Sequence, residues 1–482
     1  MKDTAMTIEP SALQCIAGQW RHGQGRRTLD VLNPANAQVV ARFQAASAQD
    51  IEEALGATEA GFGHWRAMTA LERGHRLRRA ATLLRERTAE IAPTLTEEQG
   101  KTRLEAEREI EQAAQMIEWN AEEGRRTMGQ TIPSRHPGVS FQTMKLPVGP
   151  VAALTPWNFP VMLSAIKVSA ALAAGCSVIL KPAEETPRAA AALVRCFHDA
   201  GIDGRVLQML VGEAAQISSA LIASPAIRKI SFTGSTQVGR LLAQQAGEQL
   251  KPITLELGGH APAIVCADAD LARTVAALAQ IKLRNAGQIC ANPSRFLVHR
   301  SLCARFVDAF RAVAENTVMG DGAAEGTTMG PLTHGRRAAA VAGLVEDARQ
   351  RGARVVCGGR AAGGPGFFYE PTVLADVPPD ARIWHEEPFG PLVPVMPFDT
   401  LDEAIAMANA LPLGLAAFGF TQHLESARRL CEEVQAGAIA INTVTLMQPE
   451  TPFGGVLDSG FGRENGPQSL EAYLVTRSVV VG

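Results

Sequence analysis

Three side chains of different chemistry lie in glycine- or proline-rich segments of this chain. Cys290 ends the segment Asn285-Ala-Gly-Gln-Ile-Cys290 and supplies a thiol. Glu256 ends an apolar run and supplies a carboxylate, and Asn158 stands between Trp and Phe and supplies a carboxamide. A thiol can attack a carbonyl carbon, a carboxamide can donate to the resulting oxyanion, and a carboxylate can activate water. Together the three groups have the chemistry that covalent oxidation of an aldehyde needs.

The residues before Cys290 distinguish its thiol from the others. Gly287 permits a tight backbone turn, which would expose the sulfur and aim the Cys290 amide at an oxyanion. Only a thiolate attacks well, so we expect a nearby base or positive charge that lowers the effective pKa of the thiol. The remaining cysteines are expected to pack as small apolar side chains: Cys15, Cys176, Cys196, Cys266, Cys303, Cys357 and Cys431.

Glu256 and Asn158 stand in surroundings that favour a chemical role. Glu256 lies in the apolar run Ile253–Leu257, and the two glycines that follow leave room for a water beside the carboxylate. A carboxylate at the end of a buried strand is suited to proton transfer, although many strand-end glutamates simply face solvent. The aromatic neighbours of Asn158 exclude water, and an unbonded amide there costs free energy. An asparagine that bonds its own backbone in a turn is the alternative.

Around these segments, strand-like and helix-like stretches alternate between about residues 147 and 265. The strand-like runs are Gly149–Leu154, Ser177–Leu180, Val206–Val211, Ile227–Phe232 and Ile253–Leu257, and the helical stretches are 163–174, 187–199, 214–223 and 236–247. Such alternation predicts an α/β fold with helices on both faces of a parallel sheet. Ligands bind such a sheet at the carboxyl ends of its strands. A second α/β lobe follows from about 261 to 440, and amphipathic helices precede both over 50–125.

The composition is that of an ordinary globular protein. The 482 residues carry a formal net charge of -3, which lacks the basic excess of a protein that binds nucleic acid or a membrane surface. The first ten residues contain no apolar signal segment, and the apolar run Val168–Leu180 is too short for a bilayer. A cytoplasmic location with reduced thiols is therefore expected. The cysteines and histidines show no metal-binding spacing, so no metal is expected.

In their order along the chain, these segments resemble the motifs of the NAD(P)-dependent aldehyde dehydrogenase superfamily, from about residue 30 to the C-terminus. The resemblance implies two Rossmann-like α/β lobes and a small β element for oligomerisation. The implied NAD-binding domain is 1–122 with 145–256, the catalytic domain is 257–464, and the oligomerisation element is 123–144 with 465–482. The strand-like segment Leu474–Val481 suits that element, and the implied assembly is a homodimer or homotetramer.

The resemblance also implies a set of dinucleotide contacts. A strand hands over to a helix at Gly234 and Ser235, where the helix N-terminus can hold a pyrophosphate. Lys181 and Glu184 would bind the adenosine ribose, unless they form a plain surface ion pair. A glutamate there would repel a 2′-phosphate, which favours NAD over NADP. The other implied cofactor contacts are Pro156, Trp157, Leu257, Glu387 and Phe389.

The implied reaction oxidises an aldehyde to a carboxylic acid. The Cys290 thiolate adds to the aldehyde, and Asn158 and the Cys290 amide hold the oxyanion. Hydride then passes to NAD, and Glu256 activates the water that hydrolyses the thioester. An enzyme that acylates coenzyme A would have no use for Glu256, and an inactive structural homologue would lack one of the three groups. A cysteine hydrolase would need a histidine beside the thiol, and no motif supplies one.

A single cation indicates the substrate. Arg284 matches a position at which succinate-semialdehyde dehydrogenases carry a carboxylate-binding arginine, although an arginine on an exposed helix face is the alternative. That branch is the nearest in motif, but its second arginine is Ile166 here. The expected wall is mostly apolar and comprises Phe159, Met162, Ile166, Met447 and Phe453. The set favours a semialdehyde with a distal carboxylate or carbonyl, with neutral aromatic or aliphatic aldehydes as the alternative.

Overall fold

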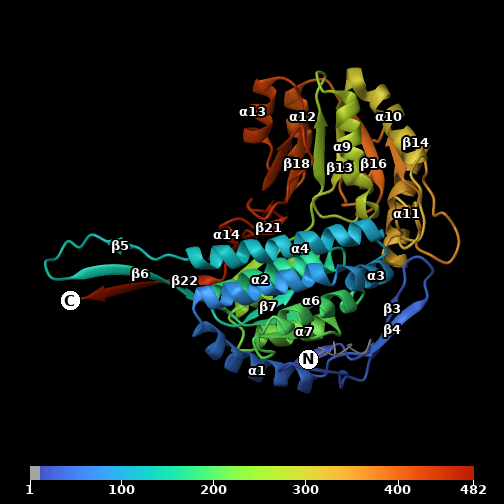
Figure 1. The fold of residues 1–482 in the computed structure, drawn as a ribbon. Helices are drawn as coiled ribbons and strands as arrows, with labels where there is room; N and C mark the ends of the chain where they lie inside the picture. Colours follow the sequence, from blue (N-terminus) through green and yellow to red (C-terminus); the bar gives the residue numbers. More distant parts are fainter. Residues whose placement is uncertain (1–10) are drawn as a thin grey trace.

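The computed structural model describes residues 11–482 and consists of two α/β lobes with an arm of strands that projects from the lower lobe (Figure 1). The lower lobe contains an eight-stranded sheet in the order β2-β1-β9-β8-β7-β10-β11-β21. Its strands are β1 (Gln14–Ile16), β2 (Gln19–Arg21), β7 (Val151–Leu154), β8 (Val178–Lys181), β9 (Leu207–Met209), β10 (Lys229–Thr233), β11 (Ile253–Glu256) and β21 (Gly460–Phe461). The last of these comes from near the C-terminus and pairs antiparallel with β11.

The five central strands of this sheet are parallel, and their carboxyl ends lie level. Leu154 at the end of β7 pairs with Lys181 of β8 on one side and with Phe232 of β10 on the other. One residue farther, Thr233 pairs with Glu256 at the end of β11. From β7 the chain runs to β8 and β9 in one direction, and later strands β10 and β11 extend the sheet in the other. The crevice at such a reversal is where open α/β sheets bind ligands.

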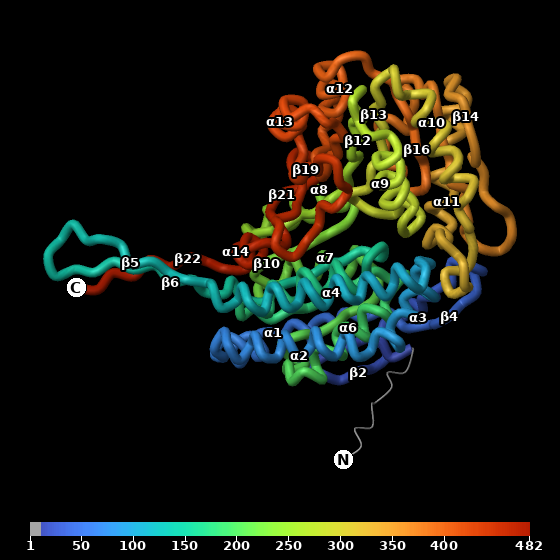
Figure 2. Tube along the Cα trace, turned by 45° about the horizontal axis from the view of Figure 1, so that its top comes forward, coloured from blue at the N-terminus to red at the C-terminus, as the bar shows by residue number. Residues whose placement is uncertain are grey.

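Helices cover both faces of the lower sheet, because alternate strand residues point to opposite sides. Val151 and Ala153 pack into the core that α2 to α6 cover, whereas Ala152 and Leu154 pack into the core beneath α1, α7 and α8. Figure 2 shows α1 to α4, α6 and α7 gathered in the lower lobe. The helices are α1 (Ala48–Arg66), α2 (Ala70–Glu86), α3 (Thr88–Gln99), α4 (Arg103–Glu123), α5 (Pro160–Ala174), α6 (Pro187–Asp199), α7 (Ala214–Ala223) and α8 (Thr236–Glu248).

The upper lobe contains a seven-stranded sheet in the order β14-β15-β16-β13-β12-β18-β19. Its strands are β12 (Ala261–Val265), β13 (Pro293–His299), β14 (Arg354–Cys357), β15 (Thr372–Ala375), β16 (Leu392–Phe398), β18 (Ala416–Phe420) and β19 (Ala438–Ile441). Its helices are α9 (Leu271–Leu283), α10 (Arg300–Glu315), α11 (Gly335–Gln350), α12 (Leu401–Ala408) and α13 (Leu424–Glu433). Only residues 257–260 separate β11 from β12, so the amino ends of the upper strands lie beside the carboxyl edge of the lower sheet.

The arm is a three-stranded antiparallel sheet in the order β22-β6-β5, which leaves β22 at its edge. Its strands are β5 (Thr131–Ile132), β6 (Ser140–Pro147) and β22 (Leu474–Val481). The smaller elements of the molecule are β3 (Thr28–Leu32), β4 (Val39–Gln44), β17 (Leu413–Gly414), β20 (Val456–Leu457) and α14 (Gln468–Glu471), with 3-10 turns at Gly124–Arg126, Arg284–Gly287 and Arg382–Trp384. Within residues 11–482 no helix has the length and apolar content to cross a bilayer.

The predicted alternation of strands and helices is confirmed, and the bounds predicted for two helices, 187–199 and 214–223, agree with α6 and α7. The strand-like C-terminal segment is β22. Strands β1 to β4 were not predicted, because they are short and mix polar with apolar residues. The domain boundaries stay a prediction, and residues 1–10 of the first domain, with the predicted lack of a signal segment, lie outside the described residues.

Candidate active site

The loop before Cys290 contains three consecutive residues in the left-handed backbone region. Asn285, Ala286 and Gly287 have φ values of 51°, 52° and 78°. A side chain at Gly287 would place its Cβ 2.2 Å from the carbonyl oxygen of Gly390, so only glycine fits there. The predicted tight turn is therefore confirmed. Non-glycine residues adopt this region at a cost of about 1–2 kcal/mol each, which the surrounding hydrogen bonds must offset.

Those hydrogen bonds come from both lobes. The backbone N–H of Asn285 donates to Glu105 of α4 over 2.7 Å, and its side-chain amide donates to the carbonyl oxygen of Asn158 over 3.1 Å. The side-chain oxygen of Gln288 accepts from the backbone N–H of Thr333 over 2.9 Å. The loop that carries Cys290 is thus fixed against the residues that follow β7 and against α4.

Asn158 is 3% exposed and faces this loop. Its side-chain nitrogen donates one hydrogen to the carbonyl oxygen of Gln288 over 3.1 Å, which leaves the second hydrogen for another acceptor. Among the described residues, no acceptor is found for the Cys290 backbone N–H either. The two donors can therefore hold an oxyanion that forms beside the Cys290 sulfur. The alternative of an asparagine bonded to its own turn does not describe this side chain.

Glu256 is a buried carboxylate close to the thiol. It is 2% exposed, and neither of its oxygens has a hydrogen-bond partner within residues 11–482. Burial and, to a smaller extent, the Glu464 carboxylate raise its pKa to about 7, against the opposing effects of Lys167, the Cys290 thiol and Thr233. A base with a pKa near 7 is well matched to proton transfer at neutral pH. The alternative of a solvent-facing glutamate is wrong.

Lys167 and Glu464 form a buried ion pair behind Glu256 that sequence reasoning missed. Lys167 lies on α5 with its ammonium fully buried, and it also donates to the Ser231 hydroxyl over 3.3 Å. The two members have opposite effects on the pKa of Glu256. Lys167 favours the ionised carboxylate and lowers this pKa, whereas Glu464 disfavours it and raises the pKa. Its members lie about 300 residues apart, so no local motif indicates them.

The surroundings of Cys290 do not lower the pKa of its thiol. Burial raises this pKa well above its ordinary value, and the carboxylates of Glu256 and Glu387 raise it further. The expectation of a depressed pKa is therefore wrong, because the nearest charges are negative. The thiol is protonated at rest and needs a proton acceptor as it attacks.

All eight cysteines are free thiols. Apart from Cys290, four are buried, and Cys303 and Cys357 are half-buried, as small apolar side chains would be. The expectation of apolar packing is wrong for Cys431, which is exposed on α13.

A second buried ion pair, which sequence reasoning also missed, supports the Asn158 loop from below. Lys101 pairs with Glu109 of α4, and both side chains are fully buried. Lys101 also donates to the Asn158 carbonyl oxygen over 2.9 Å. Glu109 accepts from the backbone N–H groups of Val161 and Met162 over 2.9 and 3.1 Å, at the start of α5. These contacts fix both ends of the segment that contains Asn158.

The carboxyl edge of the lower sheet has the features of a dinucleotide site. Lys181 and Glu184 lie 2.9 Å apart just after β8. Ser235 caps the N-terminus of α8, which suits a pyrophosphate. Beside it, Val238 and Leu241 are 43% and 52% exposed, an unusual pair of apolar side chains that an adenine ring could cover. The residues present therefore fit a dinucleotide.

A group of aromatic and charged side chains lies between this edge and Cys290. The ring of Trp157, which follows Pro156, meets the Phe389 ring edge-on with the ring centres 5.6 Å apart. The Arg337 guanidinium lies over the Phe389 ring at 5.5 Å. Glu387 accepts from the Gly259 backbone over 3.4 Å, and burial raises its pKa to about 8. A side chain on Gly258 would lie 2.8 Å from this carboxylate, so the glycine keeps the space open. Leu257 is buried against Gly239 of α8.

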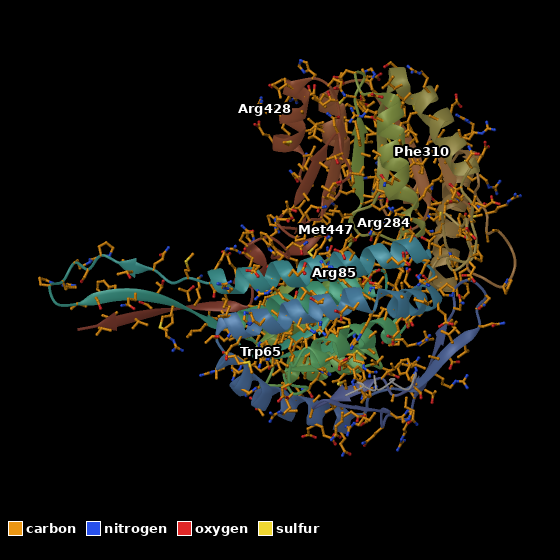
Figure 3. The ribbon with its side chains drawn as sticks, viewed as in Figure 1. Trp65, Arg85, Arg284, Phe310, Arg428 and Met447 are labelled. Atoms are coloured by element: carbon orange, nitrogen blue, oxygen red, sulfur yellow. The ribbon has the colours of Figure 1, made fainter. Side chains whose placement is uncertain are left out.

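The expected substrate residues fall into two groups. Arg284 lies over the Phe159 ring at 5.3 Å and donates to Gln112 of α4 over 3.1 Å, so it is not a free surface arginine. Figure 3 shows Arg284 and Met447 where the upper lobe meets α4. Met447 packs against the cores of both lobes. The others are core residues of a single lobe: Met162 and Ile166 in the lower, Phe453 in the upper.

The sequence model of one protein family, described as the aldehyde dehydrogenase family, matches residues 20–479. A 4-(hydroxymethyl)benzenesulfonate dehydrogenase of Comamonas testosteroni is 50% identical over 462 residues, which cover 96% of each chain. An NADP-dependent succinate-semialdehyde dehydrogenase of Escherichia coli K12 is 40% identical over 97% of each chain.

A solved structure has the same fold. The NAD+ complex of an aldehyde dehydrogenase from Bacillus cereus superimposes with a TM-score of 0.95 at 36% identity. The superposition covers 98% of this chain and 96% of the other. The likeness therefore extends through both lobes and the arm.

Proposed function

Because this chain belongs to the aldehyde dehydrogenase family, we propose that it oxidises an aldehyde to a carboxylic acid with NAD through a thioester on Cys290. The observation that carries the proposal is the convergence of three groups between the lobes. Asn158 donates to the loop that ends at Cys290, and the carboxylate of Glu256 interacts with the thiol. One site thus holds a nucleophile, an oxyanion donor and a base.

The first half of the reaction uses Cys290 and Asn158. The sulfur bonds to the aldehyde carbon, and the thiol proton passes to Glu256, which is the nearest base. The carbonyl oxygen becomes an oxyanion held by the free hydrogen of the Asn158 amide and by the Cys290 backbone N–H. Bound NAD supplies the hydride acceptor, and loss of hydride from the former aldehyde carbon leaves a thioester on Cys290.

The second half uses Glu256 as a base towards water. Glu256 first releases to solvent the proton that it took from the thiol. The ionised carboxylate then takes a proton from a water molecule, whose oxygen attacks the thioester carbon. The carbon–sulfur bond breaks, the thiol regains its proton, and the carboxylic acid leaves. The glycines at 258 and 259 remove side-chain bulk after Glu256, where a Cβ would meet Glu387 at 2.8 Å or Leu415 at 2.9 Å.

Glu184 supports NAD rather than NADP as the cofactor. Its carboxylate is paired with Lys181 at the sheet edge, and Glu185, mostly buried, lies next to it. A 2′-phosphate on the adenosine ribose would meet two carboxylates, each already paired with one cation: Glu184 with Lys181, and Glu185 with Arg336. The 2′-hydroxyl of NAD can instead donate to Glu184. The relative from E. coli is named for NADP, so the proposed preference for NAD would distinguish this chain from it.

Arg284 supports a substrate whose aldehyde is joined to a distal anion. Two cations lie over the Phe159 ring, at the junction of α4 and the upper lobe. Lys101 is fully buried in its pair with Glu109, which leaves Arg284 as the cation for a substrate. Two relatives are named for anionic compounds, a benzenesulfonate and succinic semialdehyde. The apolar side chains of Phe159 and Met447 favour a second candidate, a neutral aromatic or aliphatic aldehyde. A carboxylate or sulfonate on a carbon framework agrees with both features.

The remaining predictions stay part of the proposal. Residues 1–122 and 145–256 would form the NAD-binding domain, 257–464 the catalytic domain, and 123–144 with 465–482 the oligomerisation element. The free edge of β22 supports a homodimer or homotetramer, because an exposed edge strand can pair with a second copy. The proposed location is the cytoplasm.

The proposal is tested by NADH formation over a panel of aldehydes, with NAD and with NADP. We expect turnover with NAD in the parent and none above background with Cys290→Ala. Cys303→Ala, a half-buried cysteine on α10 and outside the site, is the matched control and should keep parent activity. Turnover by Cys290→Ala, or a preference for NADP, would contradict the proposal.

A further inference from the structure

We propose that the indole N–H of Trp119, together with Gln112 and Arg284, binds the distal anion of the aldehyde substrate. The inference rests on the proposed function and deepens it. It assigns a specificity role to Trp119, which no sequence motif indicates. The anion is a sulfonate or a carboxylate, which share acceptor oxygens and a negative charge.

Trp119 has a buried polar atom without a partner. Its indole nitrogen is shielded from solvent, and it makes no hydrogen bond to any group of residues 11–482. By contrast, the indole N–H of Trp65 donates to the Leu172 carbonyl oxygen over 2.8 Å. A buried donor without an acceptor costs free energy, so each one calls for an explanation. A ligand oxygen is the acceptor that the structure lacks at Trp119.

Trp119 lies on the stripe of α4 that contains Gln112, the hydrogen-bond partner of Arg284. Gln112 and Trp119 are seven residues apart, so they lie on one stripe of the helix two turns apart. Long helical side chains lean back towards the helix N-terminus, which tilts the Trp119 ring towards Gln112. Both side chains are half-buried, at the border of the face that packs on α5. Figure 3 shows Arg284 above the same helix.

Gln112 extends the row of donors. Its side-chain oxygen accepts from Arg284 over 3.1 Å, so its NH2 group points to the other side of the amide. Arg284 is held over the Phe159 ring at 5.3 Å and keeps further N–H groups. A guanidinium, an amide NH2 and an indole N–H are all donors, and none can accept a proton or a hydrogen bond. Such a set selects for acceptor oxygens.

The charges around Arg284 agree with this reading. The acidic groups that face it are Glu105 and Glu109, and Arg108 adds a positive charge. Glu105 is already used by the Asn285 backbone and Thr102, and Glu109 by Lys101 and the start of α5. Arg284 is therefore the group left to meet a substrate anion. The indole N–H adds a neutral third donor, which suits the three oxygens of a sulfonate.

The test compares Trp119→Phe with the parent on three benzaldehydes: 4-formylbenzenesulfonate, 4-formylbenzoate and benzaldehyde. The substitution keeps the ring and removes only the N–H. We expect KM for the anionic aldehydes to rise about tenfold, as for loss of one hydrogen bond to a charged group, with kcat little changed. Benzaldehyde should be affected less than about twofold, because it has no oxygen at that position.

Two further variants make the outcomes decisive. Trp20→Phe alters a half-buried tryptophan on β2, far from the site, and should leave all three substrates unchanged. Arg284→Met should raise KM for the same anionic aldehydes as Trp119→Phe. If Trp119→Phe raises KM more for the sulfonate than for the carboxylate, the subsite binds a sulfonate. An equal rise in KM for the two substrates means that it binds both anions.

Two results would overturn the inference: an equal rise in KM for benzaldehyde, or unchanged KM for both anions in Trp119→Phe. Failure of the parent to oxidise any aldehyde with NAD would instead refute the proposed function. The two failures are therefore distinguishable.

Discussion

Glu256 and Cys290 both become negative when they ionise, so each disfavours ionisation of the other, and the two lose their protons at different pH values. The carboxyl has a pKa raised to about 7, whereas the pKa of the thiol lies well above its ordinary value. Of the two groups, the carboxyl therefore ionises first as the pH rises. The base is ready at neutral pH while the nucleophile still holds its proton, so one group can activate the other during attack.

The pH dependence of thioester hydrolysis follows from Glu256. Its carboxyl is protonated below pH 7, and only the ionised form accepts a proton from water. We expect the steady-state rate to rise about tenfold per pH unit below pH 6 and to level off above pH 8. Glu256→Gln should give a single burst of NADH without steady turnover. A flat profile between pH 5.5 and 8, or parent-like turnover of the variant, would refute the assignment.

The three reacting groups could be predicted from sequence, because each lies beside glycines, prolines or aromatic residues that restrict the backbone. Lys167, Glu464 and Trp119 could not, because their roles depend on contacts between distant elements. The raised pKa of the Cys290 thiol was equally hidden, since it arises from Glu387 as well as from Glu256. Local patterns identify which chemistry is present but not which charges meet.

At the scale of elements, the left-handed turn before Cys290 is the most constrained part of the site. Gly287→Ala would bring a Cβ to 2.2 Å from the Gly390 carbonyl oxygen at a φ of 78°. We expect loss of activity and destabilisation of about 1–3 kcal/mol or more, measured by denaturant unfolding. The matched control is Gly343→Ala in α11, where a Cβ meets nothing within 4 Å. That variant should be neutral or slightly more stable, by up to about 1 kcal/mol. Equal stability of the two variants would contradict this account.

The contact between α4 and the start of α5 depends on the pair of Lys101 and Glu109. Lys101→Met removes the ion-pair partner of the buried Glu109 carboxylate and leaves it with the backbone N–H groups of α5 and the charge of Arg284. Breaking one partner of a buried pair typically costs about 3–5 kcal/mol, and the Asn158 carbonyl oxygen also loses a donor. We expect a lower unfolding midpoint and a lower kcat. Arg103→Met, which breaks an exposed pair with Glu107 on the same helix, should change stability by less than about 1 kcal/mol. A parent-like kcat in Lys101→Met would refute the link to Asn158.

Element bounds were predictable where apolar periodicity is strong. The Ala-rich helices α6 and α7 follow such periods, and their bounds agree with those predicted. The strands β1 and β2 are three residues each and join the sheet only through β9, which lies nearly 200 residues later. Pairing at that separation depends on tertiary structure, and no window of sequence contains it.

At the scale of the whole molecule, the arm presents an apolar edge. Val475 and Val480 of β22 are 44% and 60% exposed, and β22 has a partner on one side only. We expect Val475→Lys/Val480→Lys to lower the mass measured by light scattering to that of a single chain of 51.1 kDa. Thr131→Lys on the opposite edge strand β5 serves as the control. An unchanged mass in the double variant would place the interface elsewhere.

The strand β21 has a consequence for the order in which the protein is made. It closes the edge of the lower sheet beside β11, yet the whole upper lobe lies between the two in sequence. At about 5–20 residues per second, the roughly 200 intervening residues take about 10–40 s to synthesise. During that interval the strand that carries Glu256 has an uncovered edge. The lobe that begins first at the ribosome is thus the last to be completed.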